Sequence, residues 1–242
     1  MKIEQFLRTA ALAGALSTAS VAAQAGSLGI QYFEIPSATA GGDFNVCCSS
    51  PPATLEVISL GSALGPDGLP VTTLATASGG VVDQTSGGEI TWWSPALNSQ
   101  VSATGTGSFT LGALTDMYAP NNTGTNDTNL FETAILSGTL TGNGSDATIT
   151  VGSDDDSLVY LNGVYMGGNP GVHGTDYTTI NLGDLVGQNS VEIFYADRSP
   201  VGANLFVGVT GASVPEPATW ALMLCGVAGL GAAMRQRRRA IA

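Results

Sequence analysis

Short apolar segments separated by turn-forming residues restrict the fold of this chain more than any other feature. In residues 146–151, Ala147, Ile149 and Val151 alternate with polar neighbours, which is the period-2 pattern of a half-buried strand. Gly, Pro, Ser and Asn fill the connections between such segments, and no segment of residues 26–214 has a convincing helical stripe. The pattern predicts an all-β domain with a β-sandwich or jelly-roll architecture.

Strands are expected where alternating, β-branched or aromatic residues lie between turn signals. The segments predicted as strands are 28–35, 54–60, 71–75, 89–93, 108–114, 131–140, 146–151, 157–161, 177–182, 190–196 and 204–209. Residues 26–88 are rich in Gly, Ala and Ser and are expected to supply outer strands, whereas residues 89–211 form the denser part. The sequence leaves open whether the first block belongs to the same sandwich.

Both ends of the chain differ from this body. Residues 1–25 have a basic start, an apolar middle and a final Ala-Gln-Ala, which predicts a helical secretory signal peptide. Near the other end, the apolar segment 218–234 precedes an arginine cluster. As a helix this segment would measure roughly 26 Å, just enough to cross a bilayer core. It is expected to be a single transmembrane helix that holds the body outside the cytoplasm.

The C-terminal segment also contains a recognisable motif. Val-Pro-Glu-Pro-Ala-Thr-Trp-Ala-Leu-Met-Leu, a Gly- and Ala-rich apolar run and a terminal arginine cluster resemble the PEP-CTERM sorting signal of Gram-negative bacteria over residues 214–242. The resemblance implies that an exosortase recognises Pro215, Glu216 and Pro217 and removes the tail. The inner-membrane anchor would then be transient, and the mature form would reach the cell surface or the extracellular polymer matrix.

The negative charge of the body limits the kinds of molecule that it can bind. Residues 26–214 contain 17 acidic residues and a single basic one, Arg198, for a formal charge of −16. Such a surface repels nucleic acid and suits cations or neutral sugars, although the composition also serves solubility alone. As the only cation of the body, Arg198 is expected to form a buried pair with Asp197 or another acid.

The cysteines of the body do not define a disulfide framework. Cys47 and Cys48 are adjacent, so their Cα atoms lie roughly 3.8 Å apart, below the usual disulfide range. A strained vicinal disulfide and pairing with another chain both stay open. A zinc site is not expected, because no second ligand pair is present.

Three consecutive carboxylates, Asp154, Asp155 and Asp156, stand directly before the apolar run Leu158–Leu161 and the turn signal Asn162-Gly163. Adjacent like charges repel each other unless they point into water or a cation neutralises them. Calcium is the natural cation because it prefers carboxylate and carbonyl oxygens, although the spacing is not that of an EF-hand. A solvated turn between two strands is the alternative.

The same stretch resembles the fibro-slime and protective-antigen-type (flocculin-like) β-sandwich modules. The resemblance lies in Asp-Asp-x-Ser followed by an apolar strand and Asn-Gly, in Gly-Val-His at 171–173, and in an apolar strand that ends in an Asp-Arg pair. It covers residues 89–211 and implies that Asp154 and Asp155 hold calcium, with Asp156 solvated or a third ligand. Loop groups would complete the shell; the candidates are Asn169, His173, Asp176 and Asn204.

These observations favour a secreted, calcium-dependent adhesion or exopolysaccharide-matrix module that binds carbohydrate. Because adjacent strand residues face opposite sides, at most one of Trp92 and Trp93 is expected in the core, and the other could stack on a sugar ring. A purely structural matrix or surface protein is the alternative. An enzyme is not expected, because nucleophile–base pairs are scarce in a body with one histidine and no lysine.

Overall fold

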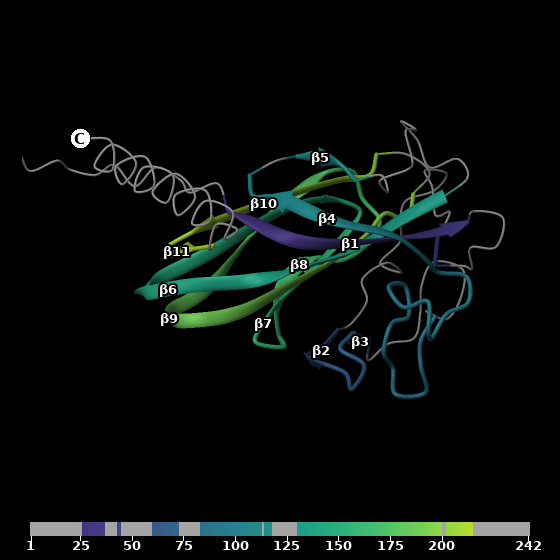
Figure 1. Cartoon of the computed structure of the whole chain (residues 1–242), viewed down its shortest axis with the longest axis horizontal. Coiled ribbons are helices and arrows are strands. Elements are labelled where there is room, and N and C mark those ends of the chain that lie inside the picture. The colour runs from purple at the N-terminus through teal and green to yellow at the C-terminus, as the bar shows by residue number, and fades with distance from the viewer. Residues whose placement is uncertain are drawn as a thin grey trace, which may run out of the picture.

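The computed structural model describes residues 26–36, 43–44, 60–72, 83–112, 114–117, 130–199 and 202–214. Its strands form one eleven-stranded sheet in which all pairings between strands are antiparallel (Figure 1). The predicted all-β class is therefore confirmed. The described part of the chain contains no helix long and apolar enough to cross a membrane. The predicted signal peptide, the apolar segment 218–234, the predicted strand over 54–59, Cys47 and Cys48 lie outside the described residues.

The order of the strands in the sheet follows a curled path. The strands are β1 (Ser27–Pro36), β2 (Leu60–Leu64), β3 (Pro70–Thr72), β4 (Ser102–Thr110), β5 (Thr115–Asp116), β6 (Leu130–Asp154), β7 (Asp156–Leu161), β8 (Val164–Asn169), β9 (Asp176–Ala196), β10 (Asn204–Thr210) and β11 (Ala212–Ser213). Neighbours follow the order β3-β2-β8-β7-β9-β6-β1-β4, while β10 and β11 also pair with β6. β1, from the first block of the sequence, thus lies in the same sheet as the later strands.

Two long strands, β6 and β9, form the centre of the body and run side by side along its length (Figure 1). Each joins two segments that the sequence predicts as separate strands. The Gly- and Asn-rich middle of β6 looks like a turn in the sequence, but it is a register shift between Asn143 and Ser145, with Gly144 at a φ of 85°. A bulge of this kind bends a strand without ending it.

The hairpin of β7 and β8 carries the predicted turn. Asn162 and Gly163 both have positive φ, 52° and 75°, and they connect the paired residues Leu161 and Val164. This is the two-residue turn that Asn-Gly favours between antiparallel strands. β8 was not expected from its sequence, because its glycine pair interrupts the strand pattern.

The core has an aliphatic part and an aromatic part that meet along β9. Ile193 and Tyr195 belong to the aliphatic cluster, whereas Phe194 and Ala196 belong to the aromatic one. This end of β9 is therefore buried on both faces. β7, which pairs with it, is buried at every position, as expected for strands covered on two sides.

Both tryptophans lie in the aromatic part of the core, so the expectation that one of them is exposed is wrong. Trp92 and Trp93 are 0% and 2% exposed. Residues 91–100 form turns and not a strand, so the alternation of a strand does not apply there. Their indole N–H groups donate to the Asp43 carboxylate at 2.6 Å and to the Tyr195 carbonyl at 2.7 Å, which satisfies both buried donors.

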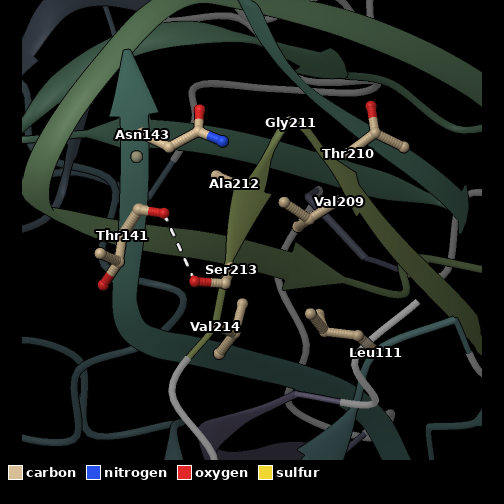
Figure 2. A pocket seen from close by; sticks show the side chains of 10 residues that line it. Leu111, Thr141, Asn143, Val209, Thr210, Gly211, Ala212, Ser213 and Val214 are labelled. Carbon is tan, nitrogen blue, oxygen red and sulfur yellow. Dashed lines mark hydrogen bonds between the residues drawn. The ribbon is translucent and has the colours of Figure 1, made fainter. Parts of the chain in front are cut away.

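The chain leaves the described body beside a cavity of about 580 Å³. Figure 2 shows its lining, which comes from residues 141–143 of β6, residues 209–214 and Leu111. β11 closes one side, because Ala212 and Ser213 pair with Gly142 and Thr141. Val214, the last described residue, is 5% exposed, so the body extends to the residue before Pro215.

This edge leads to a prediction on stability. A chain that ends at Val214 should keep the full stability of the body, whereas one that ends at Gly211 loses the β11 pairing and the buried Val214. The loss is expected to be about 2 kcal/mol, the value of burying one valine, or roughly 4–8 °C in melting temperature. Thermal unfolding of the two truncated proteins measures it. Equal melting temperatures would contradict the described role of β11.

Candidate metal centre

Three acidic side chains meet at the ends of the two long strands. Asp154 ends β6, Asp155 connects it to β7, and Asp197 follows β9 directly. Ala196, at the end of β9, pairs with Asp156 of β7, so Asp197 lies beside Asp155 and the three residues converge. Each offers a carboxylate oxygen, and these oxygens lie within 4.8 Å of one another. We call Asp154, Asp155 and Asp197 the acidic cluster.

Asp155 is the most constrained member of the cluster. It is fully buried, it follows a cis peptide bond, and its two oxygens accept backbone N–H groups of His173 and Arg198, each at 2.8 Å. Burial raises the pKa of Asp155 to about 7, aided by the neighbouring Asp156 and Asp154 carboxylates. A fully solvated turn, the alternative reading of the sequence, is therefore wrong for Asp155 and Asp156, which are both 0% exposed.

Asp156 is not a member of this cluster and pairs with Arg198. One of its oxygens accepts the N–H of Gly171 at 2.5 Å, and the other lies 3.4 Å from Arg198 Nη1. Arg198 also donates through Nε to the Asp43 carbonyl at 2.6 Å and lies over the Trp92 ring at 5.0 Å. The expected buried pair of Arg198 thus exists, with Asp156 as its partner.

The four loop candidates lie around the cluster in different roles. His173 reaches Asp155 through its backbone N–H, while its imidazole contacts the carbonyls of Gly174 and Asn169. Asn169 donates to the Asp176 carbonyl at 2.8 Å and closes the β8–β9 loop, and the exposed Asp176 side chain accepts the N–H of Tyr177. Asn204 pairs directly opposite Asp154 in the sheet, so of the four it is the side chain that shares the face of Asp154.

The chemistry of the donors fits a hard divalent cation. Carboxylate oxygens are the preferred ligands of calcium, and each carboxylate has about four lone-pair positions, so the bonds to Asp155 leave capacity for a metal. The only basic side chain of residues 26–214, Arg198, is already engaged by Asp156. The three carboxylates of the cluster are therefore of the ligand type that suits a divalent cation such as calcium.

Asp197 is the member that the sequence did not mark as a ligand. The signal exists, because the apolar strand Val191–Ala196 ends in Asp197-Arg198, but there it suggests only that Asp197 or another acid pairs with Arg198. Its membership depends on the pairing of the end of β9 with β7, which the sequence does not reveal.

The absence of a side chain at Gly202 leaves room for the Asp154 carboxylate, which leads to a second prediction. A Cβ at Gly202 would lie 2.7 Å from Asp154 Oδ2, at a φ of 102°. Gly202→Ala should therefore displace that carboxylate and lower calcium affinity about tenfold, in addition to roughly 1–3 kcal/mol of backbone strain. Gly144→Ala is the matched control, because Gly144 also has positive φ but faces open space. Calorimetric titration should give unchanged calcium affinity for the control; equal affinity in both variants would refute the role of Gly202.

The C-terminal sorting signal is borne out by comparison with protein families. Residues 213–239 match the PEP-CTERM protein-sorting motif, and the match includes Pro215, Glu216 and Pro217. Such a motif implies export, a membrane-anchored precursor and processing by an exosortase. No curated protein matches the chain.

The body resembles PA14-type β-sandwich domains among solved structures. A PA14 sugar-binding domain from an RTX adhesin is 17% identical with a TM-score of 0.38, over 79% of this chain and 94% of that one. The A domain of epithelial adhesin 9 from Candida glabrata, solved in complex with Galβ1-4GlcNAc, is 11% identical with a TM-score of 0.38, over 79% and 84%. A β-glucosidase from Kluyveromyces marxianus is 15% identical with a TM-score of 0.38, over 48% of this chain and 15% of its own. These likenesses concern the arrangement of strands and not a ligand.

Proposed function

We propose that this chain is an exported surface module that binds carbohydrate through a calcium ion held at the acidic cluster. The observation that carries the proposal is the convergence of Asp154, Asp155 and Asp197, from two distant parts of the chain, within 4.8 Å. Like charges brought this close repel each other, and a bound divalent cation would offset that repulsion with the oxygen ligands that calcium prefers.

In this proposal the chain holds the ion by its own oxygens. Asp155 is fixed from two sides by backbone N–H groups, and Asp154 is half-buried, the least buried of the three acids. A bound calcium ion would keep coordination positions for the paired hydroxyls of a sugar, since calcium accepts six to eight oxygens. The acidic body favours neutral sugars over anionic ones. Export, implied by the sorting motif, would place the site in a calcium-containing environment outside the cell.

A third prediction tests the role of the cluster in holding calcium. At a free calcium concentration of 100 times Kd, the wild-type protein should gain about 2.7 kcal/mol of stability. Asp155→Asn should lose that gain; because its amide nitrogen cannot accept one of the two backbone N–H groups, each variant is compared with itself, with and without calcium. Asp184→Asn removes an exposed carboxylate of β9 and should keep the gain. Denaturant unfolding with calcium or with a chelator measures all three; an unchanged gain in Asp155→Asn would refute the site.

Carbohydrate binding needs its own experiment. Wild-type protein and the double variant Asp154→Asn, Asp155→Asn are applied to a printed panel of neutral and acidic glycans, with calcium or with a chelator. The proposal expects binding by the wild type in calcium alone and none by the variant. Calcium binding without any glycan binding would leave a metal-stabilised structural protein of the surface or matrix. Glycan binding that is unaffected by the chelator would refute the calcium mechanism.

A further inference from the structure

An exposed aromatic residue lies beside the acidic cluster, on the same face of the sheet. Tyr177 of β9 is 52% exposed, so it presents part of a large apolar ring with a polar tip to solvent. Tyr177 and Phe206 of β10 both pair directly opposite Gly152 of β6. Residues directly opposite each other in neighbouring strands project to the same face, so the two rings flank Gly152.

The absence of a side chain at Gly152 is what makes room for the tyrosine. A Cβ at Gly152 would lie 2.4 Å from Tyr177 Cε1, so the ring rests on the backbone of β6. Phe206 contacts it from the other strand, with ring centroids 5.7 Å apart and planes at 63°. The ring is therefore held by its neighbours and yet half open to solvent.

This aromatic pair flanks Gly152, which lies two residues along β6 from Asp154 of the acidic cluster. Gly152 and Asp154 are two residues apart in one strand, so their side-chain directions share a face, with a spacing of roughly 6–7 Å. Asn204, opposite Asp154, belongs to the same face. In the other direction along this face lie Thr150 and Thr179, whose hydroxyls are 2.9 Å apart.

We infer that Tyr177 is the stacking residue of a carbohydrate subsite on the outer face of β9, β6 and β10, next to the cation proposed at Asp154 and Asp155. A pyranose ring combines an apolar C–H face with hydroxyls at its edge. The aromatic ring suits the C–H face, and the carboxylate side suits the hydroxyls through the metal. The hydroxyl row at Thr150 and Thr179 extends the face for a second sugar unit. The assignment rests on the proposed carbohydrate function.

The chemical groups around Tyr177 favour a neutral sugar over other ligands. An exposed aromatic ring alone would fit many apolar partners, but the neighbouring positions on this face carry a carboxylate, an amide and two hydroxyls. A purely apolar partner would remove these polar groups from water without offering them hydrogen bonds, which costs free energy. An anionic partner would meet Asp154 and the acidic body.

The test compares Tyr177→Ala and Tyr177→Phe with wild type in the full-length chain, purified in detergent. The probe is a printed panel of neutral hexoses and hexose disaccharides in calcium, followed by titration with the strongest binder. We expect Tyr177→Ala to bind that sugar at least about tenfold more weakly, Tyr177→Phe to bind it nearly as well, and both to keep wild-type calcium affinity. Val186→Ala is the control, because Val186 is a more exposed apolar residue, 75% exposed, in the middle of β9 and away from Tyr177.

The possible results distinguish the stacking role of Tyr177 from the proposed carbohydrate-binding function. If wild type binds a panel sugar and Tyr177→Ala binds it equally well, the stacking role is wrong and the proposed function stands. If wild type binds calcium but no sugar of the panel, both are overturned. If Tyr177→Ala loses calcium affinity together with the sugar, Tyr177 supports the metal site and does not contact the sugar, and the inference is wrong.

Discussion

Arg198→Met is expected to destabilise the protein by about 3–5 kcal/mol, because it leaves the Asp156 carboxylate charged and unpaired in the core. Both side chains are 0% exposed, and the pair is formed by Arg198 Nη1 and Asp156 Oδ2 at 3.4 Å. The variant also loses the Nε–H donated to the Asp43 carbonyl and the contact with the Trp92 ring. Denaturant unfolding at neutral pH measures the loss.

The double variant Asp156→Leu, Arg198→Met separates the pair from the rest of the network. Replacing both partners of a buried ion pair by apolar residues of similar size is often neutral or stabilising, so the double variant should recover most of the lost stability. It should not recover calcium affinity fully, because Asp156 also holds the N–H of Gly171 in the loop that positions His173 against Asp155. If the single variant is as stable as wild type, the buried pair does not have the described role.

Without calcium, the protein is expected to lose stability as the pH rises from about 4 to about 7. Burial raises the pKa of Asp155 to about 7 in the folded protein, whereas an unfolded aspartate titrates near about 3.9. Between these values the folded state binds more protons than the unfolded state, so stability falls with rising pH. The full shift corresponds to an upper bound of about 4 kcal/mol. Burial raises the pKa values of Asp43 and Asp156 in the same direction.

Calcium should remove most of this pH dependence. The ion binds the deprotonated carboxylates, so the calcium-induced gain should be large at pH 8 and small at pH 5. Thermal unfolding across this range, with calcium or with a chelator, measures both curves. Asp155→Asn is the control and should flatten the chelator curve. A chelator curve that rises with pH would contradict the buried, charge-crowded environment described for Asp155.

The sequence predicted features that depend on short-range patterns. The alternation of residues 146–151 and the Asn162-Gly163 turn are local, and both lie where expected. The crowding of Asp154 and Asp155 is local as well, which is why a metal hypothesis could be made from the sequence. The sorting signal is linear and needs no fold.

The sequence-based predictions failed for residues whose position depends on contacts between distant parts of the chain. Trp92 and Trp93 are both buried, because they lie in a turn segment tied to Asp43 and Tyr195, and no local pattern marks that segment. Asp197 joins the acidic cluster because the end of β9 pairs with the start of β7. Tyr177 was predicted merely as the first residue of a strand; its place opposite Gly152 depends on a register that the sequence does not contain.

The most direct measurement of the calcium claim is anomalous diffraction from crystals of the protein grown with calcium. If calcium binds at the acidic cluster, one strong anomalous peak is expected within about 2.3–2.6 Å of oxygens of Asp154 and Asp155, with Asp156 still paired to Arg198. No peak at these carboxylates in crystals soaked with millimolar calcium, or a peak bound by other residues, would contradict it.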